Sequence, residues 1–174
     1  LYTGQYHIHL SDWSHPQNGT DIWLIAADGS GDPLPVATTN ANESGAVFSP
    51  DGRWLAYVSD GTGRPEVYLV SFPELGGERQ VSGGGGTFPR WAPEGDELFY
   101  LNGETLMSRA VSTQDGDLTL GVARPLFEYP RVLEYDVAPD GQRFVLRSVN
   151  EDAMTREIRV VFNWFEELER LLPN

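Results

Sequence analysis

The sequence predicts an all-β fold made of repeated units of four antiparallel strands. Two observations carry this prediction. A turn followed by a strand recurs along the chain, and the strand after the turn is apolar on both of its faces. A chain of 174 residues, 40% of them hydrophobic, is long enough for one domain with a sizeable core, so we expect a single domain over residues 1–174.

The recurring motif is clearest in residues 49–60, "SPDGRWLAYVSD". It returns as "APEGDELFYLNG" from Ala92 and as "APDGQRFVLRSV" from Ala138, so that successive motif prolines are 43 and 46 residues apart. A weaker copy, "LYTGQYHIHLSD", opens the chain. Four copies at such a period indicate a repeat architecture.

The start of each copy has the residues of a tight turn between antiparallel strands. In "SPDG", Pro50 suits a position that needs φ near −65°, and Gly52 suits an exit residue with positive φ. We expect the side chains of Asp51 and Asp140 to bond backbone amides of their own turns. The strand "WLAYV" that follows should be covered on both faces.

Two further strands follow in each copy. They read "EVYLVSF" and "GGERQVSG" in the second unit, "DIWLIAAD" and "DPLPVAT" in the first, and "TLMSRAV" and "ARPLFE" in the third. Four antiparallel strands covered on both faces form a β-propeller blade, and the internal repeat argues against a β-sandwich. The expected blades are residues 1–38, 39–83, 84–128 and 129–162.

The predicted propeller is partial. The first copy lacks an innermost strand and the last lacks a fourth one, which leaves about three and a half blades. Open blades would expose apolar faces, so we expect either a homodimer that completes the open ring or a longer natural chain. A capping box and an apolar stripe predict a short terminal helix over residues 163–172, docked on an open blade.

Composition excludes several classes of function. The net charge is −14 and all twelve basic residues are arginines, so a polyanion would be repelled and nucleic acid is not an expected partner. No apolar run approaches the roughly 20 residues of a membrane span, and we recognise no signal peptide in this segment. Without cysteine there is no disulfide or thiol chemistry.

The repeats resemble those of a known family. "FSPDGRWLAYVSD" with "RPEVYLVSF" is similar to TolB-like (WD-type) β-propellers over nearly the whole chain. "TFPRWAPEGDELFYL" and "NWFEELERLLP" resemble more closely the C-terminal propellers of bacterial serine/threonine protein kinases, although the kinase motifs themselves have no counterpart. The resemblance implies a non-catalytic binding or scaffold module for protein–protein interaction or ligand sensing, periplasmic or extracytoplasmic.

Enzymatic alternatives find little support among the motifs. There is no Gly-x-Ser-x-Gly elbow, and residues 83–86, four glycines, lack the lysine of a phosphate loop and are expected to be a flexible connection. Two alternative functions remain: an accessory propeller of a hydrolase, of peptidase or glycosidase type, and a metal-assisted hydrolase. We predict no cofactor. His7 and His9 are the metal candidates because they share one side of a strand, with His15 nearby, but spacing places no third ligand.

The innermost strands supply the candidate binding residues. Aligning the copies places Val47, Arg90 and Asp136 at one register of the strands that line a propeller axis. Arg90 could pair with Asp136, or both could bind a polar ligand in the channel mouth. The loops expected to rim that mouth are residues 38–44, 83–87 and 128–132. The expected partner is a protein or a small polar ligand.

Overall fold

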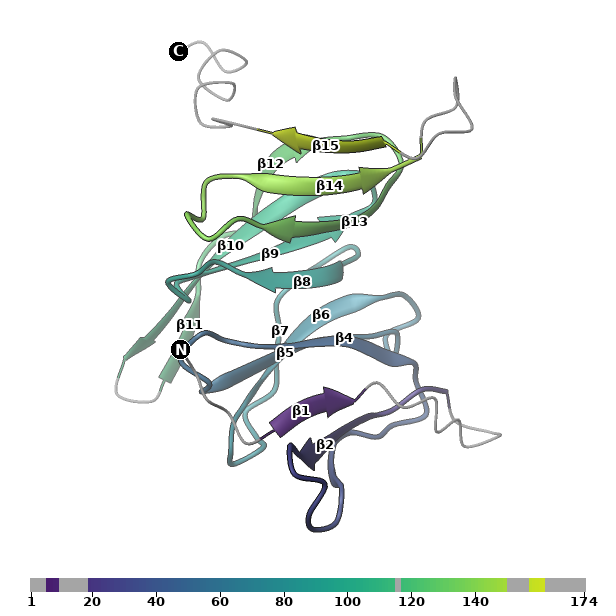
Figure 1. Ribbon diagram of the computed structural model, residues 1–174, viewed down its shortest axis with the longest axis vertical. Coiled ribbons are helices and arrows are strands. Elements are labelled where there is room, and N and C mark those ends of the chain that lie inside the picture. The colour runs from purple at the N-terminus through teal and green to yellow at the C-terminus, as the bar shows by residue number, and fades with distance from the viewer. Residues whose placement is uncertain (1–5, 10–18, 115–116, 150–156, 162–174) are drawn as a thin grey trace. The chain divides into compact units, whose positions relative to one another are not determined.

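The structure, a computed structural model, describes residues 6–9, 19–114, 117–149 and 157–161; for 6–9 and 157–161 it describes the backbone only. These residues form 15 β-strands in four antiparallel sheets, with no helix among them (Figure 1). The all-β prediction is therefore confirmed. The chain divides into two compact units, residues 1–89 and 90–174.

The first sheet has three strands in the order β1-β2-β3. They are β1 (Tyr6–His9), β2 (Ile22–Ala26) and β3 (Leu34–Ala37). The register sets His7 opposite Ile25 and His9 opposite Trp23. The β1 strand of the weak repeat is thus present, and within the described residues no innermost strand precedes it.

The second sheet has all four strands of a blade, in the order β4-β5-β6-β7. These are β4 (Glu43–Phe48), β5 (Trp54–Ser59), β6 (Glu66–Ser71) and β7 (Arg79–Gln80). Every residue of β5 is buried, as its two apolar faces predicted. One face of this sheet packs on the first sheet through a core formed by Ile22, Ala37, Leu55, Tyr57 and Val70.

The third sheet differs from the predicted blade at its outer edge. Its strands are β8 (Thr87–Trp91), β9 (Glu97–Asn102), β10 (Thr105–Gln114), β11 (Asp117–Leu120) and β12 (Arg124–Glu128). The sequence predicted one fourth strand, but two strands run antiparallel to β10: β11 beside its last four residues and β12 beside its first four. Strand β10 is ten residues long, and the segment that runs back beside it leaves the strand conformation at residues 121–123. The outer edge is therefore divided into two short strands.

The fourth sheet is three-stranded, in the order β13-β14-β15. Its strands are β13 (Val132–Val137), β14 (Phe144–Ser148) and β15 (Glu157–Val161). It packs on the third sheet through the core of the second unit, where the rings of Phe99 and Phe144 meet edge to face with centroids 5.0 Å apart. The predicted helix over residues 163–172 lies outside the described residues.

The repeated motif forms the same turn each time. A backbone hydrogen bond of 2.9 Å joins the glycine to the residue three positions before it, in the pairs Gly52 and Ser49, Gly95 and Ala92, and Gly141 and Ala138. Each glycine has positive φ, as predicted. Asp51 Oδ1 accepts from the N–H of Arg53 and Asp140 Oδ1 from that of Gln142, both at 3.1 Å. The aspartates are therefore turn residues, and these bonds hold the pKa of Asp140 below its usual value.

Candidate functional site

The two predicted binding residues lie close together in the second unit. Arg90, on β8, has its Nε atom 3.8 Å from Oδ1 of Asp136, on β13. This separation is within ion-pair range but too long for a hydrogen bond. The side chains are 26% and 71% exposed, so the pair is loose and accessible to solvent. Val47, the third residue of the predicted register, is on β4 in the other unit, where it is half-buried.

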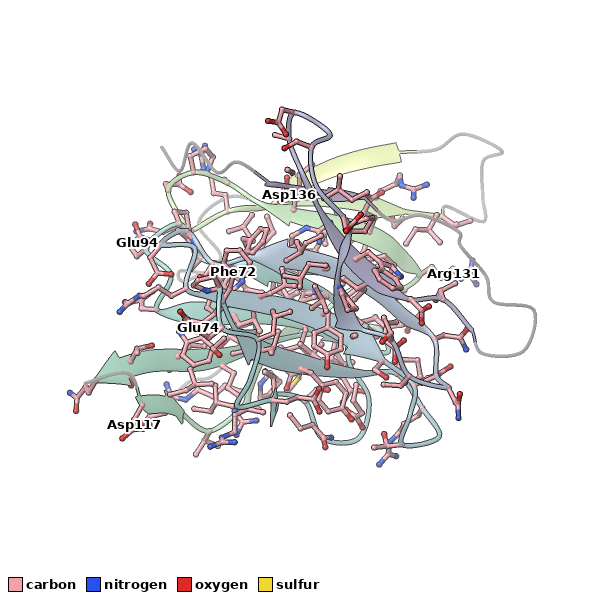
Figure 2. All side chains as sticks on the ribbon, turned by 90° about the horizontal axis from the view of Figure 1, so that it is seen from below. Phe72, Glu74, Glu94, Asp117, Arg131 and Asp136 are labelled. Carbon is pink, nitrogen blue, oxygen red and sulfur yellow. The ribbon has the colours of Figure 1, made fainter. Side chains whose placement is uncertain are left out.

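The pair lines a hollow of about 230 Å³. Its walls come from β8, β13 and β14, and the lining residues are Arg90, Glu134, Tyr135, Asp136, Val145, Leu146 and Arg147. The β-register places Asp136 opposite Val145 and Tyr135 opposite Leu146. Charged groups thus alternate with aliphatic side chains in the same small space. Figure 2 labels Asp136 among the side chains of the molecule.

The four charges of the hollow are not equally available to a ligand. Arg147 donates from Nε and Nη2 to the same oxygen of Glu134, at 3.1 and 3.0 Å, so these two charges neutralise each other. Asp136 Oδ1 accepts a bond of 2.9 Å from the N–H of Val137. At 71%, Asp136 is also the most exposed of the four side chains. It is therefore the charged group that a ligand reaches most easily.

Tyr135, next to Asp136 on β13, points to the opposite face of the strand, where its hydroxyl is buried in the core of the second unit. The residue is 2% exposed, and its oxygen has no hydrogen-bond partner within the part of the chain that the structure describes. Burial raises the pKa of Tyr135 well above its usual value; the Arg90 charge opposes this and the Asp136 charge adds to it. The phenol therefore stays neutral and can donate or accept one hydrogen bond. Leaving such a group unpaired costs about 1–3 kcal/mol.

Trp91, next to Arg90 on β8, has a similar unpaired group. Its indole Nε1 is buried and has no hydrogen-bond partner among the described residues. The innermost strands β8 and β13 thus each carry one charged residue and one buried aromatic donor side by side in the chain. Few buried polar groups in native proteins lack partners, but both of these atoms are closed to solvent and Trp91 does not line the hollow, so neither marks a ligand contact.

Sequence reasoning found Arg90 and Asp136 but not the hydroxyl of Tyr135, unpaired among the described residues, in the core behind them. A tyrosine on a buried strand is usually a core residue, so its type alone gave no signal. The aligned copies contain a weak signal. Ala46 and Pro89 occupy the position of Tyr135 in the other two repeats, and neither has a polar side chain. The missing hydrogen bond of the hydroxyl, however, is visible only in the structure.

The glycine quartet at residues 83–86 is more ordered than the flexible connection we expected. The carboxylate of Glu66, on β6, is 1% exposed, and its Oε1 atom accepts bonds of 3.0 Å from the N–H groups of both Gly84 and Gly85. The hydroxyl of Ser82 donates to Oε2, and Arg64 Nε to Oε1 at 2.9 Å. A buried carboxylate therefore holds this loop in place.

Metal binding is not tested by the described side chains. Among them, no three His, Cys, Asp or Glu residues come together as a metal would require. His7 and His9 lie on β1, whose side chains are not described, and His15 is outside the described residues. The metal candidates therefore stay a prediction. The same part of the chain contains no helix long and apolar enough to span a membrane.

Comparison with known proteins identifies the architecture. Three solved structures share the fold: a TolB from Agrobacterium tumefaciens (TM-score 0.51, 21% identity, 71% of this chain), an oligogalacturonate lyase in complex with manganese (0.59, 17%, 84%) and a nidogen/laminin complex (0.60, 13%, 83%). The fold is that of a TolB-like β-propeller. No protein-family profile matches the chain.

The TolB-like propeller also has a relative in sequence. It is 40% identical over 77 residues to tricorn protease homolog 2 of Streptomyces coelicolor, a match that covers 42% of this chain. The chain spans only part of all these proteins: 6% of the tricorn protease homolog, 44% of the TolB chain and 40% of the lyase. The closer resemblance to kinase-linked propellers stays a prediction.

Proposed function

We propose that this TolB-like propeller is a non-catalytic binding or scaffold module that engages a protein or a small polar ligand at the hollow beside Arg90 and Asp136. The observation that supports this most is the carboxylate of Asp136, which is 71% exposed in the hollow and lies 3.8 Å from Arg90. A polar or charged group of a ligand could bind that carboxylate without first breaking a close ion pair.

The chemistry of the hollow suits recognition better than proton transfer. Tyr135 keeps its proton near neutral pH because burial raises its pKa. A guanidinium such as that of Arg90 does not release a proton in proteins. General acid–base catalysis needs a group whose pKa lies near the working pH, and neither residue meets that requirement. The guanidinium of Arg90, 26% exposed, can still hold a polar group in a fixed orientation.

An array of immobilised short peptides, followed by mass spectrometry, tests this proposal. We expect the wild-type chain to retain a subset of peptides without cleaving them, and the double variant Arg90→Gln/Asp136→Asn to lose at least roughly tenfold in affinity for that subset. Asp117→Asn, which removes a charge from β11 outside the hollow, is the matched control. Cleavage of bound peptides, or binding that the double variant leaves unchanged, would overturn the proposal.

A second candidate function is an accessory propeller of a hydrolase of the peptidase type. The observation that favours it is the 40% identity over 77 residues to a tricorn protease homolog. Under this alternative, the hollow would position part of a substrate for a catalytic domain elsewhere in a longer protein. Reading the coding sequence on both sides of residues 1–174 tests it. A hydrolase domain in the same frame supports this candidate, and a kinase domain supports the kinase resemblance instead.

We further propose that two copies associate as a homodimer that completes the ring. Exposed apolar side chains at one end of the fourth sheet support this, because Leu133 and Val149 are 40% and 49% exposed there. Light scattering of the wild-type chain should report a dimer, and Leu133→Glu with Val149→Glu should shift it to monomer. A wild-type monomer at every concentration would contradict the dimer.

The proposed location is periplasmic or extracytoplasmic. The TolB-like fold supports this proposal, through the resemblance drawn from the repeats. Expression of the natural gene in its host, followed by protease treatment of intact spheroplasts, tests it. Digestion of the propeller while a cytoplasmic marker survives is the expected result, and full protection would contradict it.

A further inference from the structure

The residues that line the same hollow indicate the sign of the charge that a ligand would carry there. We propose that the hollow receives a basic side chain of a partner peptide, a lysine or arginine, with the carboxylate of Asp136 as counter-ion. This inference rests on the proposed binding function and names the chemical class that the site would take. Three observations favour a cation over an anion.

The first observation is the difference in access between the two loosely paired charges. Asp136 is 71% exposed and Arg90 only 26%, and their closest atoms are 3.8 Å apart. An incoming cation can therefore reach Asp136 without displacing Arg90. An incoming carboxylate would have to reach the less exposed Arg90 beside a carboxylate that already faces it. The Arg147 and Glu134 charges compensate each other at 3.0 Å and favour neither polarity.

The second observation is the apolar wall beside the carboxylate. Val145 lies directly opposite Asp136 in the β-register and is 39% exposed. Lysine and arginine carry long aliphatic stems below their charged ends, and such stems pack on apolar surface while the charge stays near solvent. An aspartate or glutamate side chain is too short to use the same wall in this way.

The third observation is the charge of the whole chain. At −14, the protein attracts cations over several ångströms and repels anions before contact. Complementary charge raises the rate of encounter and suppresses wrong partners.

Binding of capped tripeptides tests this inference. The probes are Ac-Gly-X-Gly-amide, with lysine, arginine, glutamine or glutamate at X, titrated into the isotope-labelled chain and followed by NMR. We expect the lysine and arginine peptides to bind roughly tenfold more tightly than the glutamine peptide, and more weakly as salt is raised. Asp136→Asn should abolish that preference and Asp136→Glu should keep part of it, whereas Tyr135→Phe should leave affinity unchanged because its hydroxyl is closed to a ligand.

The control is Asp117→Asn, which lowers the negative charge by the same amount but alters a residue outside the hollow; Figure 2 labels both aspartates. It should change affinity less than about twofold if the charge of Asp136 acts locally. A glutamate peptide that binds best and depends on Arg90 would overturn the cation inference and leave the proposed binding function standing. No binding by any of the four peptides would contradict the inference, and the peptide array would then decide the proposed function separately.

Discussion

Oε1 of Glu66 accepts a hydrogen bond of 3.0 Å from the N–H of Gly84, eighteen residues further along the chain. Gly85 donates to the same oxygen. Burial tends to raise the pKa of Glu66, but the bonds from Ser82 and the two glycines outweigh it and leave that pKa below its ordinary value. The ionised carboxylate is thus part of what holds the 83–86 loop.

Replacing Glu66 with Gln should lower the free energy of unfolding by roughly 1–3 kcal/mol at pH 7, because charge-assisted bonds to a buried group are lost. A carboxylate whose pKa falls on folding contributes stability above its unfolded pKa, about 4.3, and loses it as pH falls through the folded value. The difference between wild type and variant should therefore shrink in urea unfolding at pH 3. Glu74→Gln, at an exposed site on the same unit, is the control. An equal difference at both pH values would contradict the role of the charge.

Gly86 is expected to tolerate no side chain. A Cβ there would stand 2.4 Å from Oγ and 2.6 Å from Cβ of Ser82. Ser82 cannot easily move, because its hydroxyl donates to Glu66 and accepts from the N–H of Val67 at 2.8 Å. Gly86→Ala should cost roughly 1–3 kcal/mol of unfolding free energy by overpacking.

Gly83→Ala is the matched control for Gly86→Ala, since a Cβ at that position meets nothing within 4 Å. Thermal melts of the two variants side by side should separate them clearly. Equal loss of stability in both would mean that backbone freedom, and not contact with Ser82, is what the glycines supply.

Tyr135 and Tyr57 should respond in opposite ways to loss of the hydroxyl. Tyr135→Phe removes a buried group without a partner in the described chain, so stability should be unchanged or higher by up to about 1 kcal/mol. Tyr57→Phe removes a hydrogen bond to Glu78 and should lower stability by roughly 1 kcal/mol. Chemical denaturation measures both. A clear loss of stability in Tyr135→Phe would show that the free protein already satisfies that hydroxyl.

Asp136→Asn should have little effect on folding. Its contact with Arg90 is 3.8 Å long and its side chain is 71% exposed, and exposed pairs of this kind contribute less than about 1 kcal/mol. The melting temperature should therefore stay close to that of the wild type while the preference for basic peptides is lost. A large drop in stability would instead assign Arg90 and Asp136 a structural role, which was the alternative left open by the sequence.

The strands and turns were predictable because they depend on short stretches of chain. Pro50 and Gly52 determine a turn through their own φ preferences. The apolar residues of β5 predict burial on both faces of the strand. The split of the outer strand into β11 and β12 was not predictable. It depends on the length of β10, and "TLMSRAV" does not show where that strand ends.

The candidate site was predictable in part for the same reason. The register of the repeats brought Arg90 and Asp136 to equivalent positions, and they lie 3.8 Å apart at their closest charged atoms. Which of the two residues a ligand reaches depends on the exposed fractions of their side chains. Those fractions depend on how neighbouring strands pack around each side chain. The compensation of Arg147 by Glu134 likewise arises from the pairing of β13 with β14.

The amino-acid sequence by itself determined the repeating antiparallel strands, the glycine turns and the acidic charge, because each is a property of residue type and local spacing. Only the tertiary structure decided that Glu66 holds the glycine loop and that the hydroxyl of Tyr135 has no partner in the described chain. Hydrogen bonds between residues far apart in sequence depend on how strands pair and bend. No local pattern specifies whether a buried polar group finds its partner.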